Sequence, residues 1–300
     1  MKIKIENISK FFDDTKALKK VNLAIAKGSI YGLVGSNGAG KTTLLKIMAG
    51  LYTPDTGEIC IDNEKVFENE NLKSKIIYLP DILYFFPGYR IKDMATFYKR
   101  IYHSFNDARF EKLKQVFKID VKMKIHKLSK GMQRQVAFWL ALSIMPEILI
   151  LDEPLDGLDP IMRQVIKNLI IQEVAEREMT VIIASHDLNE IEGLSNFIGI
   201  LHEGTVVLSK DLDDLKTDIH KVQIVIKEGD LQDFYKDFSI VNDESRGELK
   251  ILVVKGDKEK IINYLEKLQP IIIEILPLTL EEIFIYELRG VGYEVKNINL

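Results

Sequence analysis

The sequence predicts an α/β fold, in which a parallel sheet is covered by helices and extended by an antiparallel edge sheet, a helical insertion and a small C-terminal α+β domain. Up to about residue 210, short and near-continuous apolar runs recur with helical patterns between them, as in parallel strands buried on both faces. Runs near the N-terminus alternate apolar and polar residues instead, which is typical of sheets with one exposed face. After residue 210, strand-like and helical segments alternate in a way that predicts a separate α+β domain.

Four apolar runs are expected to form the parallel sheet. They lie at residues 30–34, 76–79, 148–151 and 181–184. The alternating runs that are expected to form the edge sheet lie at residues 2–5, 21–25 and 58–61. From residue 88 to about residue 145 the apolar spacing is helical, which predicts a helical insertion between two core strands.

The C-terminal part of the chain is expected to form a separate domain. We place the core at residues 1–215 and the accessory domain at residues 216–300, because strand-like and helical segments follow one another there in the order βαβαβα. Thr279 is followed three residues later by Glu282, a capping box that predicts the start of the last helix at this point.

Composition and charge exclude several classes of protein. The 41 basic and 45 acidic side chains give a formal net charge of -4, without the excess of basic residues that nucleic-acid-binding proteins carry. Cys60 is the single cysteine, so no intramolecular disulfide can form. No apolar run reaches the roughly 18 residues of a membrane-spanning helix, and the alternating N-terminus lacks the apolar segment of a signal peptide. We expect a cytoplasmic protein that contacts a membrane only through a partner.

A phosphate-binding loop follows the first buried run. GSNGAGKTT at residues 35–43 matches G-x-x-x-x-G-K-[ST] between a strand and a helical pattern, the context that predicts a P-loop NTPase core. Backbone N–H groups of such a loop converge on phosphate, Lys41 would contact the β- and γ-phosphates, and Thr42 would bind Mg²⁺. The nucleotide-binding residues expected here are Gly35, Ser36, Asn37, Gly38, Ala39, Gly40, Lys41, Thr42 and Thr43.

Two other buried runs end in side chains suited to hydrolysis. ILILDEP places Asp152 and Glu153 at the carboxyl end of a strand, where Asp152 would hold Mg²⁺ through water and Glu153 would polarise the attacking water. VIIASHDL ends in His186, which would hydrogen-bond the γ-phosphate or orient Glu153. The carboxyl ends of parallel strands meet at one edge of a sheet, so we expect these side chains to face the phosphate loop.

The segment LSKGMQRQV begins at residue 128 and has the features of a helix start. Ser129 and Gly131 can present a hydroxyl and backbone N–H groups to an anion, but the segment alone is better explained as a plain helix cap. Taken together, the motifs of residues 1–215 resemble the ATP-binding subunits of ABC transporters. GSNGAGKTT corresponds to the Walker A loop, LSKGMQ to the signature, ILILDE to the Walker B strand, DGLD to the D-loop and His186 to the switch histidine.

The resemblance implies an ATP site shared by two subunits. In this family two nucleotide-binding domains close head to tail, so Ser129 and Gly131 would face the γ-phosphate bound by a partner. Phe12 would stack on the adenine, with Phe11 as the alternative. ATP with Mg²⁺ would favour the closed dimer, and hydrolysis would reopen it. The implied partners are a transmembrane permease and a second ATPase subunit, which is either identical or related.

The sequence departs from the family pattern at several positions. Asp81 stands where the family usually has a glutamine that contacts Mg²⁺ and the attacking water, and we expect Asp81 to bind metal and contribute to catalysis. Lys130 and Met132 replace a glycine and a glutamine of the signature. The stretch YFFPGYR at residues 84–90 is expected either to pack as a loop or to lie beside the groove that receives a permease helix.

The tail PLTLEEIFIYELRG resembles the end of exporter-type subunits, which predicts an exporter attached to the inner face of the cell membrane through its permease. Two alternatives remain. One is a soluble ABC ATPase that acts on ribosomes or nucleic acid, although such proteins usually carry two nucleotide domains or long coiled coils. The other is a non-hydrolysing regulatory subunit, which Asp81 and Lys130 suggest. The sequence does not identify the transported substrate, because the residues that contact it would belong to the permease.

Overall fold

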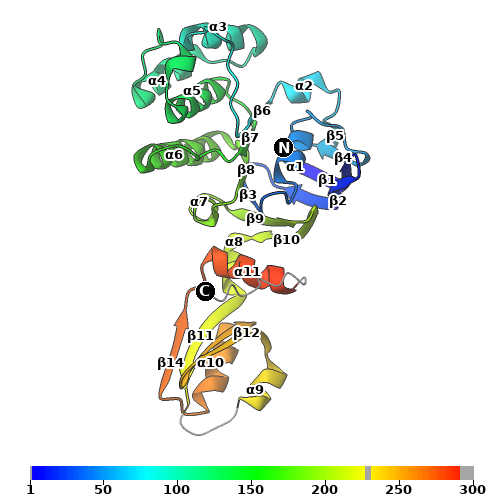
Figure 1. Cartoon of the computed structure of the whole chain (residues 1–300), viewed down its shortest axis with the longest axis vertical. Coiled ribbons are helices and arrows are strands. Elements are labelled where there is room, and N and C mark those ends of the chain that lie inside the picture. Colours follow the sequence, from blue (N-terminus) through cyan, green and yellow to red (C-terminus); the bar gives the residue numbers. More distant parts are fainter. Residues whose placement is uncertain (1, 227–230, 291–300) are drawn as a thin grey trace. The chain divides into compact units, whose positions relative to one another are not determined.

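The computed structural model describes residues 2–226 and 231–290, and the chain divides into two compact units, Met1–Val206 and Val207–Leu300 (Figure 1). The predicted α/β fold class is confirmed. The domain boundary that the sequence places after residue 215 falls inside the short helix α8 (Leu212–Thr217).

The central sheet has the strand order β10-β9-β3-β8-β7-β6. Its strands are β3 (Ile30–Val34), β6 (Ile76–Leu79), β7 (Ile148–Asp152), β8 (Thr180–Ser185), β9 (Phe197–His202) and β10 (Thr205–Asp211). The four predicted strands β3, β8, β7 and β6 pair in parallel, and β9 pairs in parallel with β3. Every residue of β3, β7 and β8 is buried, which explains why these strands appear in the sequence as continuous apolar runs.

The predicted antiparallel edge sheet is also present, with the order β2-β1-β4-β5. It is formed by β1 (Ile3–Phe12), β2 (Thr15–Ile25), β4 (Thr56–Ile61) and β5 (Glu64–Lys65). Ile3, Ile5 and Ile8 of β1 point into one apolar core together with Leu44 and Leu45 of helix α1 (Lys41–Met48). This core therefore fixes α1, and the loop before it, between the two sheets.

The segment between β6 and β7 is helical. It contains α3 (Ile91–Ile101), α4 (Asp107–Phe117), the 3₁₀ turn η1 (Ile125–Lys127) and α5 (Lys130–Ser143), which lie together as one group in Figure 1. Trp139 of α5 is fully buried and stacks on Phe110 of α4 with a centroid distance of 4.6 Å. Its indole N–H also donates a hydrogen bond to the Phe110 carbonyl oxygen at 2.8 Å, so α4 holds α5 in place.

Three further helices complete the first unit. They are α2 (Glu70–Lys73), α6 (Pro160–Arg177) and α7 (Leu188–Glu192). Arg109 of α4 contacts the buried carboxylate of Glu173 on α6, and Arg177 donates to the same carboxylate at 2.5 Å. This ion-pair cluster ties the helical insertion to the helix that follows β7.

The second unit is an antiparallel sheet with the order β12-β13-β11-β14. After α8 it contains β11 (Ile219–Val225), α9 (Gln232–Asp237), β12 (Ser239–Arg246), β13 (Leu249–Lys255), α10 (Lys258–Glu266), β14 (Ile272–Leu276) and α11 (Leu280–Gly290). Phe234 of α9 and Ile261 of α10 pack on one face of this sheet. The predicted capping box is confirmed, since the Thr279 N–H donates to the Glu282 carboxylate at 3.0 Å.

One strand of the second unit was not predicted. The sequence pattern gave βαβαβα, whereas the structure inserts β12 before β13. β12 is an edge strand with mostly exposed or half-buried side chains, so it has little of the apolar alternation by which strands are recognised. In the part of the chain that the structure describes, no helix is both long enough and apolar enough to cross a membrane.

Candidate functional site

The phosphate loop lies between β3 and α1, as its sequence requires. Gly40 caps α1 with a φ of 105°, a left-handed conformation that favours glycine. A Cβ atom added to Gly40 would lie 2.6 Å from the carbonyl oxygen of Ala17, so the loop also needs the small residue for a close backbone approach. The N-terminus of α1 therefore follows the phosphate loop directly, and the free N–H groups of a helix N-terminus suit an anion.

A cavity of about 530 Å³ lies at this helix start. The predicted site residues that line it are Ser36, Asn37, Gly38, Ala39, Gly40, Lys41, Thr42, Thr43, Asp81, Asp152 and Glu153. Gly35, Phe12, His186, Ser129 and Gly131 are not part of this lining. The donor set suits Mg²⁺ with a triphosphate, because Thr42, Asp152 and Asp81 offer oxygen ligands and Lys41 offers a cation.

Lys41 points its ammonium group into the loop. The side chain is 7% exposed, and Nζ donates hydrogen bonds to the carbonyl oxygens of Gly35 at 2.7 Å and Ser36 at 3.4 Å. Burial lowers the pKa of Lys41 below its ordinary value, and the nearby carboxylates of Glu153 and Asp152 oppose this effect. Burial disfavours the charged form of Lys41, and the nearby carboxylates do not fully compensate for this. An anion bound in the cavity would stabilise the charged ammonium group further.

Asp152 is buried at the end of β7 with only 2% of its surface exposed. The Tyr78 hydroxyl on β6 donates a hydrogen bond to its Oδ2 atom at 3.2 Å. Burial raises the pKa of Tyr78 above its ordinary value, and the negative charge of Asp152 raises it further, so the phenol stays a hydrogen-bond donor. Tyr78 thus orients the carboxylate that we expect to bind the metal through water.

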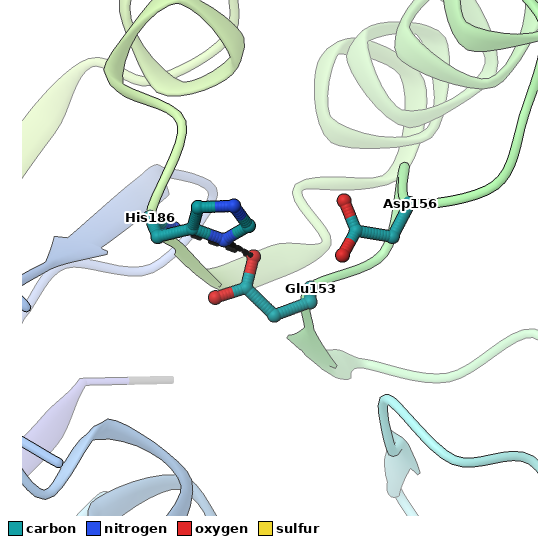
Figure 2. A group of neighbouring side chains, drawn as sticks. All are labelled: Glu153, Asp156 and His186. Carbon is teal, nitrogen blue, oxygen red and sulfur yellow. Dashed lines mark hydrogen bonds and ion pairs between the residues drawn. The ribbon is translucent and has the colours of Figure 1, made fainter. Parts of the chain in front are cut away.

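Glu153 lies between the imidazole of His186 and the ammonium group of Lys41. Its Oε2 atom is 2.9 Å from Nδ1 of His186 (Figure 2). Its Oε1 atom is 4.0 Å from Nζ of Lys41. This hydrogen bond is the main reason why the pKa of His186 is raised, and the charges of Glu153 and Asp156 add to the shift. Ligand atoms of Glu153, Asp156 and His186 all lie within 4.8 Å of one another. The geometry supports His186 as a residue that orients Glu153.

Asp81 lies just beyond β6 and is held by an arginine. Arg134 of α5 donates to the Asp81 carbonyl oxygen at 2.9 Å and to its Oδ1 atom at 3.2 Å. Asp81 lines the cavity at the phosphate loop and also a second cavity of about 470 Å³, whose lining includes Lys130, Arg134 and Asp156. Asp81 therefore lies between the nucleotide site and the signature segment.

The signature segment forms the start of α5. The Ser129 side chain accepts a hydrogen bond from the Met132 N–H at 3.2 Å, which makes Ser129 the N-cap residue. A Cβ atom added to Gly131 would lie 2.6 Å from the carbonyl oxygen of Gly157 in the D-loop. The glycine is therefore required by contact with the D-loop of the same chain.

The two candidate adenine-stacking residues are both on the surface. Phe12 is 42% exposed and packs edge-on against Tyr52 at a centroid distance of 5.8 Å. Phe11 is similarly exposed and lies under the ammonium group of Lys16. Neither ring lines the cavity, so adenine stacking stays a prediction.

Several residues at the site were missed by sequence reasoning. The additional residues that line the cavity are Thr15, Lys16, Ala17, Lys19, Glu203 and Gly204. These residues come from the start of β2 and from the turn between β9 and β10. The Lys19 N–H donates to the Gly204 carbonyl oxygen at 2.7 Å, which joins β2 to the turn. The Gly204 N–H donates to the Ala39 carbonyl oxygen at 3.0 Å, which joins the turn to the phosphate loop. No local motif marks them, because tertiary contact alone brings them to the loop.

Comparison with known proteins agrees with this geometry. The ABC transporter family matches residues 18–156. The ABC transporter ATP-binding protein YtrB of Bacillus subtilis is 34% identical over 289 residues, which cover 96% of this chain and 98% of YtrB. The bacitracin transport ATP-binding protein BcrA of Bacillus licheniformis is 32% identical over 71% of each chain. The lantibiotic transport ATP-binding protein SrtF of Streptococcus pyogenes is 34% identical over 70% of this chain and 91% of its own.

Solved structures show the same relationship. A dimeric bacterial ABC transporter cassette is 26% identical and covers 70% of this chain and 98% of its own, with a TM-score of 0.64. The same cassette has been solved as a dimer in a post-hydrolysis state bound to ADP and Pi, with a TM-score of 0.63. Together with the phosphate loop, the paired carboxylates and the signature helix, these matches show that the chain belongs to the ATP-binding proteins of ABC transporters.

Proposed function

We propose that this chain hydrolyses ATP and thereby powers a separate transmembrane permease, as the ATPase subunit of an exporter. The observation that carries the proposal is the position of Glu153. Its carboxylate lies at the phosphate cavity, 2.9 Å from His186 and next to the buried Asp152. This is the arrangement that a hydrolytic site needs, with a base beside a phosphate-binding loop and a second carboxylate suited to metal binding.

Each residue has a distinct task in this proposal. The N–H groups of the loop and the ammonium group of Lys41 bind the β- and γ-phosphates. Thr42 and Asp81 supply oxygen ligands for Mg²⁺, and Asp152 holds the metal through water. The metal, when bound, neutralises charge on the phosphates. Glu153 accepts a hydrogen bond from the attacking water and polarises it, while His186 fixes the orientation of the carboxylate.

The signature helix supports a site shared by two subunits. Ser129 and Gly131 do not line the nucleotide cavity of their own chain, although Ser129 starts a helix of 14 residues whose N-terminus suits an anion. In a head-to-tail dimer this helix start would meet the triphosphate of the partner. ATP would then contact both subunits only in the closed state, and hydrolysis would remove that link.

Export and membrane attachment are supported by two further observations. The relatives BcrA and SrtF are named for bacitracin and lantibiotic transport. In the stretch after Asp81, Ile82 and Tyr84 are 85% and 75% exposed, whereas Phe86 packs against Phe97 of α3 at 5.0 Å. Part of the aromatic stretch is thus packed, and the exposed part offers an apolar surface to a permease helix.

Turnover in the purified protein tests the proposal. We expect Mg²⁺-dependent release of phosphate from ATP by the wild-type chain, and loss of at least about 99% of this activity in Glu153→Gln, since a general base contributes a factor of about 10² to 10⁴. Glu176→Gln on the exposed side of α6 is a suitable control, because it removes a carboxylate far from the loop in sequence and outside the cavity lining. A wild-type rate equal to that of Glu153→Gln would contradict hydrolysis by this site.

A further inference from the structure

Arg134 is a nearly buried arginine that joins two segments of the proposed active site. It lies in the second turn of α5 and is 8% exposed. One terminal nitrogen donates to the Glu153 carbonyl oxygen at 2.9 Å. The other donates to the Asp81 carbonyl oxygen at 2.9 Å and to the Asp81 carboxylate at 3.2 Å.

These hydrogen bonds fix two backbone segments relative to each other. Asp81 follows β6 and Glu153 follows β7, and these two strands are parallel neighbours. The main chain leaves the sheet at both points, and Glu153 has a left-handed φ of 46° that any non-glycine residue adopts at a cost. A planar guanidinium group with several fixed donors can bind both carbonyl oxygens at once, which a single ammonium group does poorly.

The charge of Arg134 is balanced by Asp81. Among the ion pairs of residues 2–226 and 231–290, the one that involves Arg134 is with the Asp81 carboxylate. Asp81 also lines the phosphate cavity together with Asp152 and Glu153, so three carboxylates face the place of a triphosphate. In the absence of Mg²⁺ and of a neighbouring cation, the charge of Asp81 would repel the phosphates.

We propose that Arg134 is a positioning residue for ATP hydrolysis. Its hydrogen bonds hold the backbone at Asp81 and Glu153, and its charge neutralises Asp81, so that an aspartate can occupy a place beside the triphosphate. The inference rests on the proposed function. It also accounts for the aspartate at position 81, because that carboxylate, although 52% exposed, is the counterion of the nearly buried Arg134.

A double-mutant cycle separates this role from a merely structural one. The variants are Arg134→Met, Asp81→Gln and the double variant. The probe is the non-hydrolysable analogue adenylyl imidodiphosphate without Mg²⁺, titrated by calorimetry, so that the proposed role of Asp81 as a metal ligand does not affect the result. Arg134→Met should weaken binding about tenfold, because the charge of Asp81 beside the triphosphate is then no longer balanced. The double variant should bind at least about threefold more tightly than Arg134→Met, because the two positions are coupled.

Thermal unfolding gives a second, independent cycle. Asp81→Gln alone should lower the unfolding temperature, since it leaves the buried cation of Arg134 without its counterion. The double variant should unfold at a higher temperature than Asp81→Gln. Arg134→Lys keeps the charge but not the planar donors, so it should bind the analogue nearly as well as wild type while its ATP turnover falls about tenfold.

Arg109→Met is the matched control. It also removes a nearly buried arginine that pairs with a carboxylate, Glu173, but it lies outside the nucleotide cavity. It should lower the unfolding temperature and leave analogue binding unchanged. The proposal is overturned if the double variant binds no better than Arg134→Met, or if Arg134→Lys turns over ATP at the wild-type rate. If the wild-type chain binds the analogue neither without nor with Mg²⁺, the proposed function fails instead.

Discussion

Nδ1 of His186 lies 2.9 Å from Oε2 of Glu153, at the ends of the neighbouring strands β8 and β7. The His186 backbone N–H reaches the same oxygen at 3.3 Å. His186 thus holds the Oε2 atom of Glu153 through both its side chain and its backbone. The Oε1 atom of Glu153 faces Lys41. This contact connects the fold to the proposed chemistry, because the parallel register of the sheet alone brings the two residues together.

The pH dependence of His186 follows from this contact. The pKa of His186 is raised above 6.5, mainly by its hydrogen bond to Glu153. The pair therefore stabilises the folded protein fully below pH 6.5, and this contribution is lost as the pH rises through the higher folded-state value. An NMR titration of the nucleotide-free protein should show the raised pKa, and Glu153→Gln should lower it. Asp156→Asn should lower it less, and equal shifts in both variants would contradict the assigned cause.

Lys41→Met should remove nucleotide binding without destabilising the nucleotide-free protein. Burial disfavours the charge of Lys41, so an apolar side chain of similar length avoids that cost. With MgATP at 100 times its dissociation constant, the free energy of unfolding of the wild-type protein should rise by about 2.7 kcal/mol. That of the variant should rise hardly at all. Scanning calorimetry with and without MgATP measures both effects. Lys46→Met on the same helix, outside the cavity lining, should keep the wild-type gain.

Tyr78→Phe should weaken the response to Mg²⁺. The phenol donates the hydrogen bond that orients the buried carboxylate of Asp152, and losing such a partner typically reduces metal affinity about tenfold or more. The Mg²⁺ concentration for half-maximal ATPase activity should rise accordingly. Tyr98→Phe removes a half-buried phenol of α3 and serves as the control. An unchanged Mg²⁺ requirement in Tyr78→Phe would show that Asp152 does not depend on this hydrogen bond.

Gly131→Ala should destabilise the first unit. The added methyl group would lie 2.6 Å from the Gly157 carbonyl oxygen, so the signature and the D-loop would have to separate. Overpacking of this kind costs about 1 to 3 kcal/mol, which urea unfolding can resolve. In Gly193→Ala the nearest atom would lie 3.5 Å away, so this variant should have little effect. Equal stability of the two variants would contradict the tight contact.

The sequence predicted most strands of the core sheet and many of the residues that line the cavity at the phosphate loop. Buried parallel strands need continuous apolar runs, so their ends, and the side chains at those ends, can be located from the pattern alone. Asp152, Glu153 and His186 were found in this way. The edge strand β12 was missed because its side chains are largely polar and exposed.

Residues that act through tertiary contacts could not be found from local patterns. Tyr78 is 74 positions from the carboxylate it binds, and Arg134 is 53 positions from Asp81. Tyr78 lies within a predicted strand, and Arg134 lies within a predicted helix, so neither position stands out. Their hydrogen bonds depend on the register of β6 beside β7 and on how α5 packs, which only the folded chain defines.

The central claim is that ATP joins two subunits through the signature helix. Light scattering on Glu153→Gln, which should bind MgATP without turning it over, tests this most directly. We predict a particle of twice the subunit mass with MgATP and a monomer without nucleotide, either for this chain alone or when it is mixed with a related ATPase subunit. A monomeric mass in saturating MgATP, for the chain alone and in every such mixture, would contradict the account.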